Sequence, residues 1–139
     1  MNIEYRVATQ NDFYGLEKLI NDNFNIKLKQ IVSNNDQYNI IAVCGDKVVG
    51  NLLFTKIYNP IKDIYYGKID YVCVDINYRN NHIATKLLDF VEKKEKSIDY
   101  FELTSNKLRE AANKLYLSEG YEIIDTNLFR KYINVKKNL

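Results

Sequence analysis

The stretch YRNNHIATKLL, residues 78–88, follows closely behind a strand-like run, IDYVCV, at residues 69–74. A buried strand therefore leads into a polar turn that carries Arg79, and this turn opens an amphipathic helix. The start of a helix presents free backbone N–H groups and the positive end of the helix dipole. The stretch therefore predicts a binding site for an anion, most naturally a phosphate group.

Length and composition narrow the class of protein. The chain has 139 residues, 46% of them hydrophobic, which predicts one domain over residues 1–139 with a substantial core. The net charge of +2 is spread over mixed acids and bases, and it gives no argument for nucleic acid or a membrane surface as a partner. No apolar run approaches the roughly 20 residues that cross a bilayer, and residues 1–6 do not resemble a signal peptide.

Cysteine and histidine usage favours a cytoplasmic protein without a metal. Cys44 and Cys73 each lie in a predicted strand, and we expect both to be reduced thiols. With a single histidine in the chain, His82, and two distant cysteines, no set of metal ligands is expected.

Hydrophobic periodicity predicts the element order β-α-α-β-β-β-α-β-α-β-β. Strands are expected at residues 3–7, 38–43, 48–57, 64–75, 100–104, 121–124 and 128–135. Helices are expected from Thr9, at 25–33, at 81–95, and over a segment that buries Leu108, Ala111, Ala112 and Leu115 before Gly120 ends it. The crossover from the fourth strand through a helix to the fifth implies a parallel pair in an otherwise antiparallel sheet, an α+β (α/β) fold.

The turn resembles that of a known enzyme family. Arg79-Asn80-Asn81-His82-Ile83-Ala84 is similar to the signature Arg/Gln-x-x-Gly-x-Gly/Ala of GNAT-superfamily N-acetyltransferases, with His82 where glycine is usual. Downstream, Tyr116 and the Gly120-Tyr121 pair stand where this family has a tyrosine helix and its end. The resemblance spans nearly the whole chain and implies a mixed, mostly antiparallel sheet of about seven strands with a splayed parallel pair, flanked by about four helices.

The resemblance also implies a cosubstrate, acetyl-CoA, and the residues that bind it. The turn would hold the pyrophosphate through its backbone amides, the fourth strand would pair with the pantetheine arm, and the later helix would contact the CoA arm. These positions are Arg79, Asn80, Asn81, His82, Ile83, Ala84 and Thr85 in the turn, Val72, Cys73 and Val74 in the strand, and Asn113 in the helix. A Cβ at residue 82 requires an allowed φ for the backbone to approach phosphate closely.

The chemistry implied is direct attack of an amine on the thioester. Tyr116 matches the tyrosine that relatives use as general acid, which protonates the CoA thiolate as it leaves. The base that deprotonates the ammonium group stays open between Glu102, Asp70 and water. An amide near Val74 would face the thioester oxygen, where negative charge develops.

The sequence therefore predicts acetyl transfer to the primary amine of a small molecule. Transfer to a protein or peptide amine is a first alternative. A non-catalytic acyl-CoA sensor is a second, supported by the departure at His82. Relatives often form homodimers, but no feature of the sequence decides the assembly state.

Overall fold

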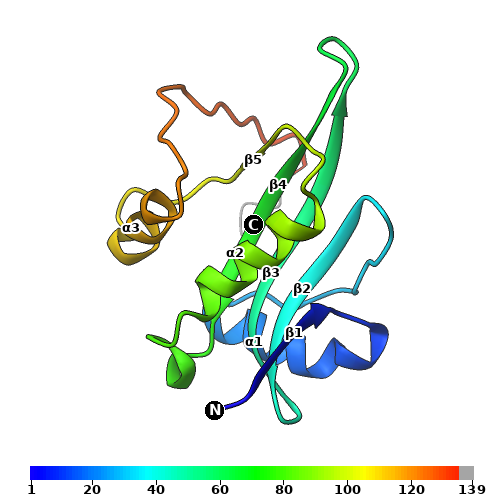
Figure 1. Ribbon diagram of the computed structural model, residues 1–139, viewed down its shortest axis with the longest axis vertical. Coiled ribbons are helices and arrows are strands. Elements are labelled where there is room, and N and C mark those ends of the chain that lie inside the picture. Colours follow the sequence, from blue (N-terminus) through cyan, green and yellow to red (C-terminus); the bar gives the residue numbers. More distant parts are fainter. Residues whose placement is uncertain (135–139) are drawn as a thin grey trace.

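The computed structural model describes residues 1–134 and is built around a five-stranded sheet in the order β1-β2-β3-β4-β5 (Figure 1). The strands are β1 (Ile3–Val7), β2 (Gln37–Cys44), β3 (Lys47–Asn59), β4 (Ile64–Val74) and β5 (Tyr100–Glu102). The helices are α1 (Phe13–Phe24), α2 (Ile83–Lys94) and α3 (Glu110–Ser118), with short 3-10 turns at Gln10–Asp12 and Ile76–Tyr78.

The first four strands pair in antiparallel fashion, and β5 joins β4 in parallel. A tight turn at Gly45, with φ +60°, joins β2 to β3, a conformation that glycine adopts without steric penalty. The crossover from β4 to β5 runs through α2. The predicted parallel pair in a mixed, mostly antiparallel sheet is therefore confirmed.

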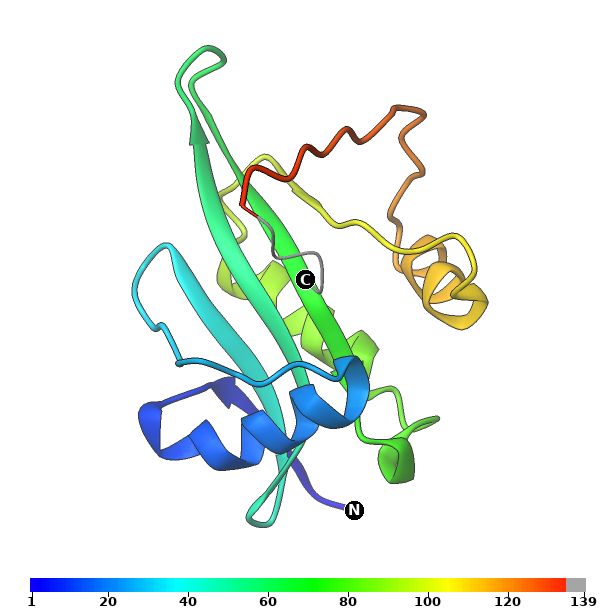
Figure 2. The ribbon, with the colours of Figure 1, turned by 180° about the vertical axis from the view of Figure 1, so that it is seen from behind.

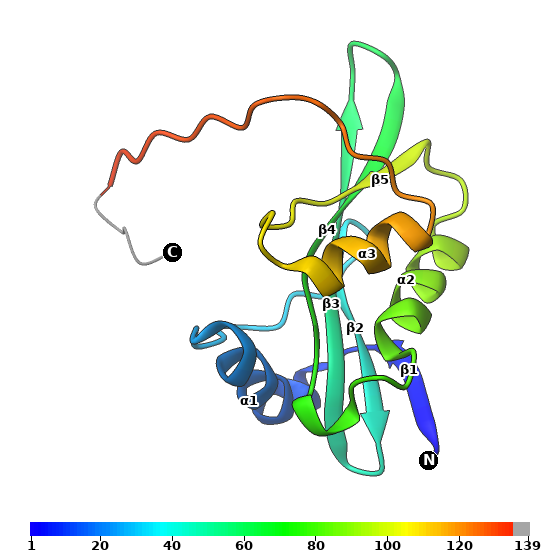
Figure 3. The same cartoon turned by 90° about the vertical axis from the view of Figure 1, so that its left-hand side faces the viewer.

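Helices α1 and α2 cover opposite faces of the sheet (Figure 3). Each has one apolar face, because its buried residues recur at spacings of three and four. They are Leu16, Leu19 and Ile20 in α1, and Ile83, Leu87, Leu88 and Val91 in α2. The face covered by α2 carries the larger cluster, which includes Phe54, Ile69 and Val72.

The start of the first helical segment is tied to the first strand. The Asp12 carboxylate accepts the backbone N–H of Thr9 at 2.7 Å, as the capping pattern predicts. The same carboxylate receives both terminal nitrogens of Arg6 at 2.8 Å. This two-pronged pair fixes the angle at which the chain leaves β1 and enters α1.

The predicted helix at residues 25–33 is wrong. Asn25 takes a left-handed conformation, with φ 54°, and ends α1. The chain beyond it is irregular, and Ile26 and Leu28 pack partly against the α1 cluster while Ile31 is buried. Their spacing of two or three residues suits an extended chain that lies along a surface better than a helix.

The predicted strands at 121–124 and 128–135 are also wrong, as are the totals of seven strands and four helices. Residues 121–134 are extended but pair with no strand in the described part of the chain, and residue 135 lies outside the described residues. A strand needs a partner as well as a pattern, and none is provided for this segment.

The predicted buried stripe of the last helix is corrected in the same way. Leu108 precedes α3 and is 87% exposed, Ala111 is exposed, and only Ala112 and Leu115 are partly buried. Tyr116 is the buried residue of α3, and Gly120, with φ +92°, follows the helix as expected.

Candidate active site

Strand β4 has an unpaired backbone edge where β5 leaves it, and we call this edge, residues 69–74, the notch. Strand β5 pairs with β4 only at Tyr66, Gly67 and Lys68, whereas β4 continues to Val74. Within the described residues, the backbone of β4 from Ile69 onward has no strand on that side, and Figure 1 shows β5 and the chain after it diverging from β4. An extended ligand that carries amide groups can pair with such an edge as an added strand.

A bulge in β4 shapes this notch. The pairing of β3 with β4 shifts between Asn51, which faces Cys73, and Leu53, which faces Asp70. Tyr71 is the extra residue, with φ 54°, and its ring packs edge-on against Phe24 at the end of α1. The bulge resets the alternation of side chains, so that Val72 joins the α2 cluster and Cys73 the α1 cluster.

Two buried asparagines hold the bulge. The side-chain amide of Asn51, which is 0% exposed, donates to the carbonyl oxygen of Tyr71 at 3.0 Å. Asn39, 7% exposed, donates from its own amide to the Asn51 side-chain oxygen at 2.9 Å. We call this chain of bonds the asparagine latch. A buried polar pair of this kind fixes a backbone conformation that apolar packing alone would not specify.

The turn before α2 takes the form that an anion site requires. Asn80 and His82 both have positive φ, 65° and 60°, and His82 is the N-cap of α2. The left-handed conformation at residue 82 explains why glycine is usual at this position of the signature. Because Lys86 is the first residue whose N–H bonds back to the turn, at His82 O, the amides of residues 83–85 point out of the helix start. They fit a phosphate group.

Arg79 and Asn81 brace this turn from the side. Arg79 donates to the carbonyl of Val74 at 3.1 Å and to the side chain of Asn23 on α1 at 3.1 Å. Asn81 donates to the carbonyls of Tyr78 and Arg79. The guanidinium therefore ties the end of β4 to α1 and also adds positive charge beside the turn.

Tyr116 on α3 and Cys73 on β4 are both buried, and the charge of Arg109 acts on both. Burial raises the pKa of the Tyr116 phenol above its usual value, although the nearby guanidinium of Arg109 opposes the shift. Burial also raises the pKa of the Cys73 thiol to about 12, against the lowering influence of Arg109 and Arg79. The thiol is therefore protonated at neutral pH, which disfavours Cys73 as a covalent acetyl carrier. The phenol remains a proton donor over the same range.

Asp70 and Glu102 lie on one face of the sheet. Glu102 pairs in register with Lys68, which is two residues from Asp70, so all three side chains leave the same side. Ile69, between Lys68 and Asp70, belongs to the α2 cluster, so this side is the one covered by α1. Glu102 is exposed and Asp70 half-buried.

Asn113 lies on α3, and its side-chain nitrogen is engaged by the loop before the helix, at the carbonyls of Asn106 (3.0 Å) and Lys107 (3.4 Å). Arg109 is the exposed N-cap of the same helix. Both residues stand on the side of the notch formed by α3.

Sequence reasoning missed Asn39, Asn51 and Asn23. The signal for Asn51 was available, because a single amide stands inside the apolar run of β3. A polar residue in the middle of a buried strand is expected to have a specific partner.

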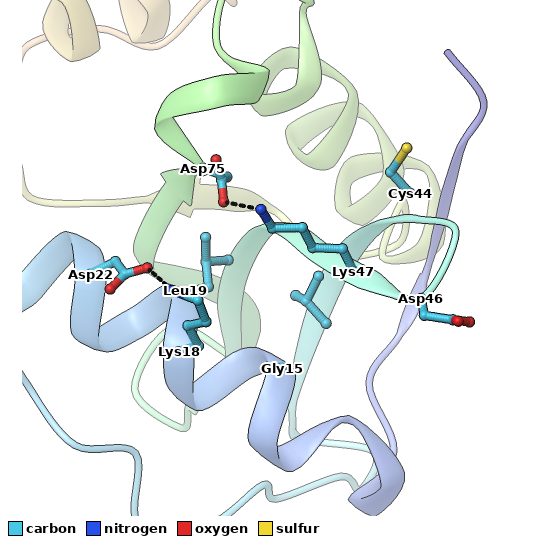
Figure 4. Close-up of a pocket in the computed structure, with 9 residues that line it drawn as sticks. Gly15, Lys18, Leu19, Asp22, Cys44, Asp46, Lys47 and Asp75 are labelled. Carbon is cyan, nitrogen blue, oxygen red and sulfur yellow. Dashed lines mark hydrogen bonds and ion pairs between the residues drawn. The ribbon is translucent and has the colours of Figure 1, made fainter.

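A separate hollow of about 440 Å³ lies between α1, the β2–β3 turn and the end of β4 (Figure 4). Four of its charged groups form ion pairs, Lys47 with Asp75 at 3.3 Å and Lys18 with Asp22 at 2.9 Å, and Asp46 also lines it. This pairing is consistent with a joint between elements, and the notch beside β4 is the better candidate for chemistry.

No helix within residues 1–134 is both long and apolar enough to cross a membrane. Solved structures share the fold of this chain at low identity. A ribosomal-protein-alanine N-acetyltransferase from Brucella melitensis biovar Abortus 2308 is 17% identical, with a TM-score of 0.81 over 95% of this chain and 100% of that one. The aminoglycoside acetyltransferase meta-AAC0020 from an uncultured soil metagenomic sample, in complex with sisomicin, is 19% identical, with a TM-score of 0.79 over 95% and 96%.

A transcriptional regulator from Bacillus halodurans C-125 is 20% identical, with a TM-score of 0.82 over 94% of this chain and 100% of that one. No curated protein matches the sequence. The family model described as "Acetyltransferase (GNAT) domain" matches residues 35–123, more than half of the chain and the whole region of bulge, notch and turn. On this match the chain belongs to the GNAT acetyltransferase family.

Proposed function

We propose that the protein transfers the acetyl group of acetyl-CoA to the primary amine of a small molecule by direct attack. The observation that carries this proposal is the unpaired edge of β4 beyond its bulge. Two further features support it, the free amides at the start of α2, which follows β4 in the chain, and the buried phenol of Tyr116 on α3.

The chain's own groups would hold acetyl-CoA in two places. Amides of residues 80–85, at the positive end of α2, bind the pyrophosphate, with Ala84 small enough to permit close approach. The backbone of residues 72–74 pairs with the amides of the pantetheine arm, and an N–H near Val74 donates to the thioester oxygen. Such a fixed donor stabilises the developing oxyanion by roughly 3–4 kcal/mol in measured cases.

Proton transfer then falls to three side chains or to water. The amine nitrogen bonds to the acetyl carbon, the C–S bond breaks, and Tyr116 gives its proton to the departing sulfur. Glu102, Asp70 or a water chain takes the proton that the ammonium group must lose before attack, and the second proton that the nitrogen loses as the amide forms restores the proton of Tyr116. Tyr116 is suited to its role because its raised pKa keeps the phenol protonated at neutral pH.

The acceptor is proposed to be a cationic amine. Asp70 and Glu102 leave the same face of the sheet as Lys68, so the three side chains together carry a net negative charge, which favours a protonated amine over a neutral substrate. The structural similarity to an aminoglycoside acetyltransferase is consistent with a small polyamine-like or amino-sugar acceptor.

Calorimetry with CoA, followed by thiol release with acetyl-CoA and a panel of amines, tests the proposal. We expect CoA to bind and a small amine to be turned over. Turnover on peptide or protein amines alone would identify the protein-acetylating alternative. CoA binding without turnover on any amine would identify a sensor, and the absence of CoA binding would refute every version.

A further inference from the structure

The last turn of α1 is fastened to β4 and to the turn behind it at two points. The side-chain oxygen of Asn23 accepts a hydrogen bond from the Arg79 guanidinium at 3.1 Å. Phe24, the next residue, packs edge-on against the ring of Tyr71, with 5.2 Å between the ring centres. Figure 2 shows this end of α1 lying across β4, close to the turn that leads into α2. The end of α1 is therefore held beside both the bulge and the turn.

Arg79 connects α1 to the backbone of β4. Besides its bond to Asn23, its Nε–H donates to the carbonyl oxygen of Val74 at 3.1 Å. A charged donor makes a stronger hydrogen bond than a neutral one. The side-chain nitrogen of Asn23 donates to the carbonyl of Leu19, one turn back in α1, at 2.9 Å. The helix thus orients the Asn23 amide so that its oxygen faces Arg79. We call the contacts from Asn23 through Arg79 to Val74 the Asn23–Arg79 relay.

The pairing of β3 with β4 fixes the direction of the Val74 N–H. Gly50 stands opposite Val74 in the ladder. The next residue, Asp75, donates its N–H to the carbonyl of Val49 on β3 at 2.8 Å. Successive residues of a strand direct their backbone polar groups to opposite sides. The N–H and C=O of Val74 therefore point away from β3, into the notch, which agrees with the bond that Arg79 makes there.

The two backbone groups of Val74 have different partners. Its carbonyl is taken by Arg79, whereas its N–H is the donor proposed above for the thioester oxygen. A donor stabilises an oxyanion most when its direction is fixed before the reaction begins. By holding the carbonyl, Arg79 restricts rotation of the backbone at Val74 and keeps the N–H aimed into the notch.

We propose that Asn23 is a positioning residue for acetyl transfer and acts through Arg79 on the Val74 N–H. The kinetic part of this inference rests on the proposed function, whereas the relay itself needs no acetyl-CoA. Loss of Asn23 should lower kcat and leave the KM for acetyl-CoA almost unchanged. The reason is that the amides of residues 83–85 stay in place, so that mainly an interaction of the transition state is weakened.

Two substitutions at one position isolate the bond to Arg79. Asn23→Ala and Asn23→Asp both lose the bond to Leu19, but the aspartate keeps an oxygen for Arg79. We expect kcat to fall about 10-fold in Asn23→Ala, with KM within about twofold, because a misdirected donor stabilises the oxyanion less. Asn23→Asp should stay close to wild type. Equal losses in both variants, or losses that only follow the folded fraction in urea, would overturn the proposal.

The control variant lies one residue earlier in the same turn. Asp22 is exposed and pairs only with Lys18 among the ion pairs of residues 1–134, at 2.9 Å. Asp22→Ala therefore removes a surface contact of α1 without touching the relay, and we expect wild-type kcat and KM. A loss of kcat in Asp22→Ala as large as in Asn23→Ala would show that any weakening of α1 has this effect, which would overturn the specific role of Asn23.

A double variant tests whether Asn23 acts through Arg79. Arg79→Ala alone should lower kcat, and the addition of Asn23→Ala should cause no further loss, because both substitutions break the same relay. Additive losses would overturn it. A higher affinity for CoA in Asn23→Ala, measured by calorimetry, would also overturn it, since Asn23 would then be holding Arg79 away from the phosphate groups.

NMR of the free protein separates the relay from the proposed activity. In ¹H–¹⁵N spectra, the signals of the Arg79 Nε–H and the Val74 amide should shift in Asn23→Ala and stay near their wild-type positions in Asn23→Asp and Asp22→Ala. Unchanged signals in Asn23→Ala would overturn the relay even if the enzyme is active. If the signals shift as expected but the wild type acetylates no amine, the proposed function fails, and the kinetic role of Asn23 fails with it.

Discussion

Tyr116 combines burial with a free hydroxyl. It is 8% exposed, and no hydrogen bond found within residues 1–134 uses its phenol oxygen. Tyr116→Phe should therefore leave the fold and CoA affinity nearly unchanged, while it lowers turnover by about 100-fold or more, the usual range for loss of a general acid. Turnover and calorimetry measure the two effects, with the half-exposed Tyr65→Phe as control. Equal turnover in Tyr116→Phe would remove this residue from the mechanism.

The pH profile of the wild type follows from the same residue. An acid must be protonated to act, and a raised pKa extends the protonated range upward. We therefore expect no fall in turnover attributable to Tyr116 below about pH 10, the usual pKa of a phenol.

His82 holds a conformation that suits glycine better. With φ 60° and a Cβ, it pays a steric penalty that glycine would not. His82→Gly should raise the free energy of unfolding in urea by roughly 1 kcal/mol and preserve CoA binding. His82→Ala removes the imidazole but keeps the Cβ, so it should give no gain. Equal gains in both variants would show that the backbone conformation is not the cause.

At the scale of an element, the bulge of β4 depends on the asparagine latch. Asn51→Leu removes the donor to Tyr71 O and leaves the Asn39 amide without its acceptor. We expect a raised KM for acetyl-CoA and turnover lowered by about 10-fold or more, because small displacements at a reacting centre are costly.

The control for this variant lies between the same two strands. Gln37 donates to Thr55 at 3.1 Å, across β2 and β3 but away from the bulge. Gln37→Leu should lower stability slightly without a change in KM. If activity in both variants falls only with the folded fraction, the latch has no positioning role.

The junction of β1 with α1 makes stability depend on acid. Hydrogen bonds from Arg6 are the main cause that lowers the pKa of Asp12 from 3.8 to about 2 in the folded chain. The unfolded chain therefore binds this proton more readily. The contribution of Asp12 is full above about pH 4 and is lost as the pH falls toward 2. Asp12→Asn should lower the free energy of unfolding by about 1 kcal/mol at pH 7. The urea midpoint of this variant should change less than that of the wild type between about pH 4 and pH 2. A urea midpoint that falls as steeply with acid in the variant as in the wild type would contradict this.

The elements differ in how far the sequence could predict them. Helix α2 and strand β4 were predictable because their apolar spacing matches their burial, and the turn between them carries a recognisable signature. The segment at residues 121–134 has a strand-like pattern, but pairing depends on a partner strand that periodicity cannot reveal. The latch escaped because its two asparagines are 12 residues apart and meet only once β2 and β3 pair.

At the scale of the whole molecule, the notch beside β4 has a consequence for handling the protein. The unpaired backbone of β4, which we propose pairs with pantetheine, can also pair with an extended segment of another molecule, and two copies can associate through it. Bound CoA would then cover the unpaired edge of β4 and would stabilise the folded state by mass action. Protein solutions from which CoA has been removed should become turbid sooner on storage than solutions that contain CoA.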